Sequence, residues 1–208
     1  MLSASKGQMH IAPLDAPRRR PQAGRLKLRN WNIIMELTTT ALKEILFSDL
    51  DRELKVTRDV LVALPEDKYG WKPHAKSMAL GNLALHVAYL PQWMQFALAQ
   101  DELDAANAPR PPKELKSRAD LLTRFDANAA ALNEAVAKFD PATANRPWTM
   151  RNGAQVFVTR PKWMVYRTWS LNHMVHHRGQ LCLYLRLLDV PVPTVYFNTA
   201  DRQEFVFE

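Results

Sequence analysis

The chain has 208 residues, of which 47% are hydrophobic and 24% are charged, and this composition is typical of a folded globular domain. No apolar run approaches the ~20 residues that a membrane-spanning helix needs, and the single cysteine, Cys182, cannot form an internal disulfide. These features argue against a membrane protein and against a disulfide scaffold, and they favour the reducing environment of the cytoplasm.

The net charge of +7 is concentrated at the N-terminus. Residues 1–34 contain seven basic residues and one acidic residue, a net charge of +6, so residues 35–208 carry only +1. We expect residues 1–34 to be a disordered basic extension, because they lack an apolar period and contain prolines, and residues 35–208 to form one domain. The extension could be a phosphate-binding tail, a transit peptide or a leader upstream of a natural start at Met35, which is the interpretation we favour.

The first half of the domain contains two amphipathic segments. Leucine and isoleucine recur at three- and four-residue spacings from Glu36 to Leu64, which predicts a helix that Pro65 ends. After a loop at 65–73, Ser77 is a candidate cap for a second helix that runs to about Glu102. The proline-rich stretch 104–112 then predicts a crossover linker.

The second half contains two more helical segments separated by a hairpin. Apolar residues predict a third helix from about Lys113 to Phe139. Two short strands around an Asn-Gly turn are predicted within 148–158. Thr159 is a candidate cap for a fourth helix that ends near Leu188. The expected fold is therefore an all-α four-helix bundle with a small β-hairpin before the last helix.

Three histidines are the most informative residues of the domain. His173 and His177 are four residues apart, so on a helix they lie one turn apart on the same face. His86 lies on an otherwise apolar face of the second predicted helix. His176 falls on the flank of the fourth helix, which makes it a weaker alternative to His177 as the partner of His173.

The residues alone leave two explanations for these histidines. Each ring could be a core histidine hydrogen-bonded to a carbonyl group or a water molecule. Alternatively, one cation could satisfy His86, His173 and His177 together, because each buried ring nitrogen needs a partner. Three neutral nitrogens without a carboxylate leave positions open to water, as in catalytic metal sites, and they suit zinc, nickel, copper or iron(II).

Other residues of the fourth predicted helix have less specific roles. Arg178 lies outside the inner face, so we expect it at the surface or at an interface. Gly179 is expected to permit the close approach of a neighbouring helix or a second subunit. Gln180 points inward and could orient a water molecule or fill space, and Cys182 lies in an apolar run that predicts a buried, inert thiol. No general base can be identified, and no phosphate loop or zincin motif is present.

Several segments together resemble the DinB-like (DinB/YfiT) superfamily of metal-dependent enzymes. They are Ala63-Leu64-Pro65-Glu66, Trp71-Lys72-Pro73, Leu83-Ala84-Leu85-His86, Asn172-His173-Met174-Val175-His176-His177-Arg178-Gly179-Gln180-Leu181 and 187–193. The resemblance covers about residues 36–202, and the helix-four motif is its most specific part.

The resemblance implies an up-down-down-up bundle that commonly forms a homodimer. It also implies a divalent metal bound by one histidine of the second helix and a His-x-x-x-His pair of the fourth, which correspond to His86, His173 and His177. Some relatives are transferases or isomerases that use low-molecular-weight thiols, and others resemble amide hydrolases. The family motif contains no nucleic-acid reader.

Three functional hypotheses follow. The first is a cytoplasmic, mononuclear metalloenzyme with a small-molecule substrate, of the hydrolase or thiol-dependent transferase type, with zinc, nickel or iron as the metal. The second is a non-catalytic, metal-binding dimeric stress protein. The third, a nucleic-acid binder that acts through residues 1–34, is disfavoured because the domain itself is almost neutral.

Overall fold

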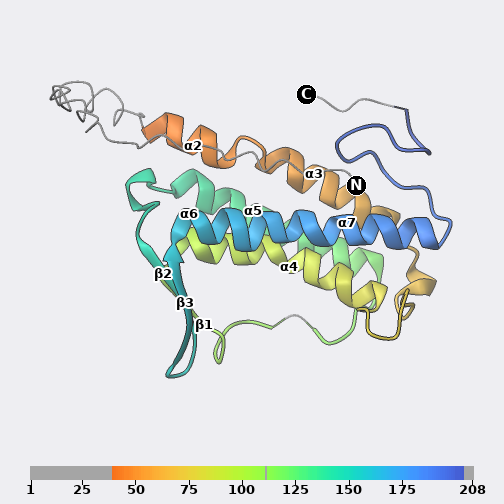
Figure 1. The fold of residues 1–208 in the computed structure, drawn as a ribbon, viewed down its shortest axis with the longest axis horizontal. Coiled ribbons are helices and arrows are strands. Elements are labelled where there is room, and N and C mark those ends of the chain that lie inside the picture. Colours follow the sequence, from red (N-terminus) through yellow and green to blue (C-terminus); the bar gives the residue numbers. More distant parts are fainter. Residues whose placement is uncertain (1–38, 111, 204–208) are drawn as a thin grey trace, which may run out of the picture. The chain divides into compact units, whose positions relative to one another are not determined.

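The fold is taken from a computed structural model that describes residues 39–110 and 112–203. The expected basic extension at 1–34 lies outside these residues. Within them, four long helices pack together beside a small sheet (Figure 1). No helix in these ranges combines the length and the apolar character that a bilayer crossing requires.

The first helical segment is broken in two. It consists of α2 (Thr39–Phe47) and α3 (Leu50–Ala63), whereas the sequence predicts one continuous helix. The break falls at Ser48 and Asp49, residue types whose short polar side chains compete with helical hydrogen bonding. The Asp49 carboxylate accepts two hydrogen bonds from Arg167, at 2.8 and 2.9 Å, which connect the break to the last helical segment.

Helix α4 (Leu80–Ala99) begins after the predicted cap, because a preceding loop takes over the capping. The backbone N–H groups of Leu80 and Gly81 donate to the carbonyl oxygens of Trp71 and Tyr69, at 2.9 and 2.8 Å. A Cβ atom at Gly81 would lie 3.0 Å from that of Tyr69, so this approach requires glycine. The predicted cap at Ser77 is therefore wrong, and backbone carbonyls satisfy the free N–H groups of the first turn.

Helix α5 (Arg118–Lys138) also begins later than predicted. The hydroxyl oxygen of Ser117 accepts a hydrogen bond from the backbone N–H of Asp120 at 3.1 Å, which is the standard arrangement of an N-cap. The connection from α4 to α5 is correspondingly longer than the expected proline-rich linker.

That connection contains a strand that the sequence analysis assigned to a helix end. Strand β1 (Glu102–Asp104) pairs in parallel with β2 (Pro147–Asn152), and β2 pairs in antiparallel fashion with β3 (Gln155–Pro161). Arg151 forms ion pairs with Glu102 and Asp104, at 2.9 and 2.6 Å, which hold β1 beside the hairpin. The expected hairpin is thus part of a three-stranded sheet, and its tight turn has Gly153 at a φ of 58°.

The last helical segment has three parts. A short α6 (Lys162–Met164) leads into a π-helix, η4 (Val165–Leu171), which continues as α7 (Asn172–Leu187). Thr159 belongs to β3 and does not cap this segment. The π-helix was not predicted; segments of this kind are rare and are frequently found at functional sites.

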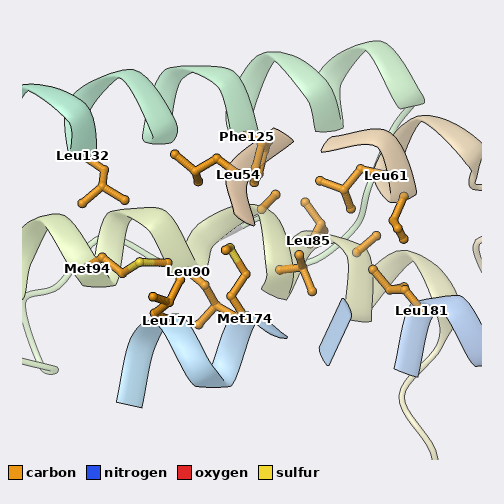
Figure 2. Packing of buried hydrophobic residues seen from close by; sticks show 14 of the residues in the cluster. Leu54, Leu61, Leu85, Leu90, Met94, Phe125, Leu132, Leu171, Met174 and Leu181 are labelled. Carbon is orange, nitrogen blue, oxygen red and sulfur yellow. The ribbon is translucent and has the colours of Figure 1, made fainter. Parts of the chain in front are cut away.

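The core lies between the four long helices. Helix α4 packs against α5 and α7, and α3 packs against the same two helices. Figure 2 shows the apolar side chains that fill the space between them. All of the following are almost fully buried: Leu54, Leu61, Leu85, Leu90, Met94, Phe125, Leu132, Leu171, Met174 and Leu181.

Candidate metal centre

Three imidazole rings from two helices meet inside the bundle. His86 lies in the middle of α4, and His173 and His177 lie one turn apart in α7. The Nε2 atom of His173 lies 3.3 Å from that of His86 and 2.7 Å from that of His177. One ring nitrogen from each residue falls within 4.8 Å of the others. The structure therefore brings together the three histidines that the sequence analysis selected.

In His173 and His177, the hydrogen-bond partner of Nδ1 determines whether Nε2 carries a proton. Nδ1 of His173 lies 3.2 Å from the carbonyl oxygen of Trp169, and Nδ1 of His177 lies 2.7 Å from Oε1 of Gln180. Because these oxygens only accept hydrogen bonds, each Nδ1 carries the proton in the neutral ring. The Nε2 lone pairs of His173 and His177 are then free and face one another, which is the arrangement of metal-ligating histidines.

The surroundings keep at least two of these rings neutral. Burial, together with the charges that His177 and His173 would carry, lowers the pKa of His86 to about 4. Burial also lowers the pKa of His173, although the Trp169 carbonyl opposes this effect. At neutral pH these imidazoles therefore do not need to lose protons before they bind a cation.

His176 does not join this group. Its ring centroid lies 4.9 Å from that of His177, but its side chain is exposed and it offers no nitrogen to the three-ring cluster. It lines a neighbouring cavity of about 620 Å³, whose wall also includes His86 and His173. A molecule in this cavity would contact two of the three candidate ligands.

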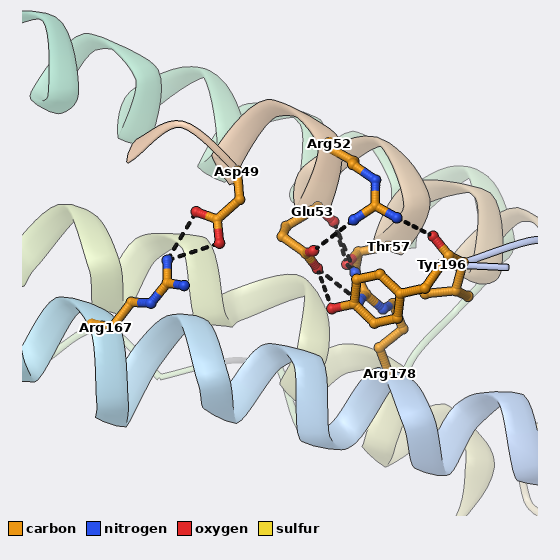
Figure 3. A network of polar contacts seen from close by, with 8 residues as sticks. Asp49, Arg52, Glu53, Thr57, Arg167, Arg178 and Tyr196 are labelled. Carbon is orange, nitrogen blue, oxygen red and sulfur yellow. Dashed lines mark hydrogen bonds and ion pairs between the residues drawn. The ribbon is translucent and has the colours of Figure 1, made fainter. Parts of the chain in front are cut away.

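The surface position predicted for Arg178 is wrong. Its side chain is only 1% exposed and forms an ion pair with Glu53 of α3 at 2.6 Å (Figure 3). The guanidinium group also donates to the hydroxyl groups of Thr57 and Tyr196, at 3.1 and 2.9 Å. The prediction failed because α7 packs against both α3 and α4, so its buried surface is wider than the single face that holds the histidines.

Glu53 is a residue that the sequence analysis missed. It is 3% exposed and shares the inner stripe of α3 with Leu50, Leu54 and Leu61. A carboxylate at an apolar stripe position is a recognisable signal, because buried charges are normally paired. Arg178 occupies the matching position in α7, between Met174 and Leu181.

The remaining predictions for α7 have mixed outcomes. Gln180 does point inward, but its role is to accept the hydrogen bond of His177. A Cβ atom at Gly179 would meet nothing within 4 Å, so no neighbouring helix in the described chain approaches it. Cys182 is partly buried, and burial raises the pKa of its thiol, as expected of an unreactive cysteine.

Comparisons with known proteins agree on one family. Residues 35–204 match the sequence profile of the DinB family, whereas no curated protein matches the chain. A DinB-like protein from Bacillus cereus ATCC 10987 has a similar structure, with a TM-score of 0.57 and 18% identity over 73% of this chain and 95% of its own. A DinB-like protein from Bacillus subtilis has a TM-score of 0.58 and 15% identity over 76% and 99% of the two chains. At these identities the structural likeness establishes the fold alone.

The lowered pKa of His86 predicts a pH dependence of stability in metal-free protein. In the unfolded chain this ring takes up a proton near its ordinary pKa of 6.5, whereas in the folded chain it does so only near pH 4. Stability should therefore fall as the pH decreases from 6.5 to 4, since the unfolded state binds more protons in this window. Urea denaturation of chelator-treated protein across this pH range measures the free energy of unfolding. A His86→Asn variant should show a flatter profile, and an identical profile would contradict the lowered pKa.

The buried ion pair predicts a large stability difference between two matched substitutions. Glu53→Gln should destabilise the protein by about 3–5 kcal/mol, because it leaves the Arg178 charge buried without a partner. Asp126→Asn breaks the Arg58–Asp126 pair, in which both side chains are about half exposed, and should cost no more than about 1 kcal/mol. Urea denaturation at pH 7 compares them. Equal losses would contradict a structural role for the Glu53–Arg178 pair.

Proposed function

The chain belongs to the DinB family, and on this premise we propose that it is a mononuclear, divalent-metal-dependent enzyme. His86, His173 and His177 would hold the ion. One observation supports this most strongly: ring nitrogens from two helices converge within 4.8 Å, and two of them are oriented by hydrogen bonds on the opposite side of the ring. Core histidines with separate partners would not need to share a point.

A bound cation would act as a Lewis acid, polarising a substrate oxygen or lowering the pKa of a bound water or thiol. Three neutral ligands would leave the full charge of the ion available for this effect. The Trp169 carbonyl and Gln180 would keep the Nε2 atoms of His173 and His177 directed at the ion. Imidazole ligands suit zinc, nickel or iron(II).

The proposed reaction is hydrolysis or transfer to a low-molecular-weight thiol, with a small-molecule substrate. Both reactions need a nucleophile activated next to the substrate, and both could use the cavity that His86 and His173 line. We assign no general base, because neither the three-histidine group nor the adjoining cavity wall, among the described residues, contains a carboxylate. We propose a cytoplasmic location on the basis of the single, unreactive cysteine.

The lack of a candidate general base favours one alternative function. In this alternative, the chain is a non-catalytic, metal-binding dimeric stress protein whose histidines use the ion to join α4 to α7. Metal binding would then appear as folding stability. The two functions differ in turnover and share the same ligands.

We further propose the up-down-down-up helix order and a homodimer. The long connection between α4 and α5, which pack against each other, supports parallel neighbours. An exposed stripe along α7 supports a dimer surface: Leu183 and Leu187 are each more than half exposed, and Gly179 has open space above it. An exposed apolar stripe of this kind is typical of an interaction surface.

The metal proposal predicts about one divalent ion per chain in protein purified without chelators. His86→Ala should lose most of this metal and all turnover on a panel of amides and thiol acceptors. His74→Ala, which changes an exposed loop histidine, should keep both. Elemental analysis and activity assays measure the two properties. Metal retained in His86→Ala would refute the ligand assignment, and stoichiometric metal without turnover would favour the non-catalytic alternative.

The dimer proposal predicts that a charge on the α7 stripe weakens association. Leu183→Asp should shift the protein towards the monomer, with at least about a tenfold loss in association constant, because a carboxylate would be desolvated at the interface. Ile45→Asp changes a comparably exposed residue of α2 and should have no effect. Sedimentation equilibrium measures both. A monomeric wild-type protein, or an unchanged dimer in Leu183→Asp, would rule out this surface.

A further inference from the structure

The cavity beside the three histidines has a distinctive wall. Its volume is about 620 Å³, which lies within the range of small-molecule sites. Apart from three histidines, two of which belong to the cluster, its residues are apolar or carry uncharged polar groups, and none is an aspartate, glutamate, lysine or arginine. They are Leu90, Trp93, Trp148, Met150, Val165, Thr168, Trp169, Ser170 and Asn172, and the third histidine is His176.

Helix α4 and strand β2 provide one part of this wall by regular spacing. On α4, His86, Leu90 and Trp93 are four and three residues apart, so they share one face of the helix. On β2, Trp148 and Met150 are two residues apart and point to the same face of the sheet. Indole Nε1 of Trp148 donates to the carbonyl oxygen of Phe96 at 3.3 Å, so its polar atom is already satisfied.

The π-helix provides the part nearest to the histidines. Trp169 lies in η4, is 39% exposed, and lines the cavity while its carbonyl oxygen accepts the hydrogen bond of His173. Ser170, in the same segment, donates its hydroxyl proton to the carbonyl of Val165 at 3.2 Å. The neutral polar groups of Thr168 and Asn172 lie at exposed positions of the wall.

We propose that this cavity selects an uncharged substrate and binds it through an aromatic or branched aliphatic group. The indole rings of Trp93 and Trp169 are partly accessible and offer apolar surface for such a group, with the buried ring of Trp148 behind them. The contacts with His86 and His173 would direct its reacting end towards the cluster. This inference rests on the proposed function for the identity of the reacting end. The apolar selectivity itself depends only on the wall.

The absence of charged side chains from the wall is what excludes ionic substrates. Away from the cluster, a carboxylate or ammonium group would lose its hydration among the apolar side chains without gaining an opposite charge, which costs several kcal/mol; only an anion at the reacting end could be stabilised by a bound divalent ion. A charged low-molecular-weight thiol would therefore have to reach the cluster from outside this cavity. The cavity would then bind the apolar molecule with which the thiol reacts.

Two dyes with the same ring system test this selectivity directly. N-phenyl-1-naphthylamine is neutral, whereas 8-anilino-1-naphthalenesulfonate carries a sulfonate. The neutral dye should bind at least about tenfold more tightly, as measured by its fluorescence in a titration of the full chain. The full chain carries a net charge of +7, of which +6 lies in residues 1–34, so this preference would oppose the overall electrostatics of the chain without being caused by the almost neutral domain. Equal or stronger binding of the sulfonate would overturn the proposal.

Substitutions at Met150 assign the binding to the cavity. Met150→Glu should weaken the neutral dye at least about tenfold, whereas Met150→Leu should leave it almost unchanged. Met150→Lys should reverse the preference, so that the sulfonate dye binds more tightly. Misfolding would not cause such a reversal, because a molten protein exposes apolar surface to both dyes. Phe157→Ala removes an exposed aromatic ring of β3 outside the wall and should change neither affinity. Loss of dye binding in Phe157→Ala alone would refute the assignment.

The His86→Ala variant separates this inference from the proposed function. It should lose the metal but still prefer the neutral dye, because the indole rings remain. If the wild-type protein bound no metal and both proteins preferred the neutral dye, the metalloenzyme proposal would be refuted and the apolar cavity supported. Metal binding without any preference for the neutral dye would refute the cavity and leave the metal site intact.

Discussion

The ion pair between Glu53 and Arg178 sets the position of α7, on which the candidate centre depends. Its two charged groups are almost completely buried, at 3% and 1% exposure, and their oxygen and nitrogen atoms lie 2.6 Å apart. Such a pair tolerates little displacement, because a buried charge that loses its partner is costly. Arg178 directly follows His177, so the contact with α3 fixes the rotation of α7 at the point where its other side presents imidazoles to α4.

The opposite ligand is positioned by an equally specific backbone contact. The loop carbonyls of Tyr69 and Trp71 accept hydrogen bonds from the first N–H groups of α4, and the absence of a side chain at Gly81 permits this approach. Trp71 in turn packs edge-on against Tyr184 of α7, with ring centroids 5.5 Å apart. The two helices that carry the histidines are thus connected through the same loop.

The sheet and the π-helix contribute side chains to the cavity beside the histidines. The bundle alone brings the imidazoles together, whereas β2 contributes Trp148 and Met150 and η4 contributes Trp169 to the neighbouring cavity. A π-helix makes i→i+5 hydrogen bonds, and its insertion before α7 changes the direction of its side chains relative to a continuous α-helix. Through its carbonyl, Trp169 also orients His173. The same residue therefore belongs to both the cavity wall and the support of the candidate centre.

The sequence by itself determined the helical class, the hairpin before the last helix and the His173–His177 pair, because these depend on local periodicity and on one-turn spacing. It put forward His86 through its apolar helix face and the family resemblance, whereas the approach of its ring to the pair is a tertiary contact. It also identified the family through the motif around these residues. Only the tertiary structure decided that Arg178 is buried, that Glu53 is its partner, that Glu102–Asp104 forms a third strand and that η4 is a π-helix. These features depend on contacts between residues far apart in the chain. A helix that packs against two neighbours buries more than one stripe of residues, and a three-residue segment becomes a strand only when it pairs with the edge of another strand.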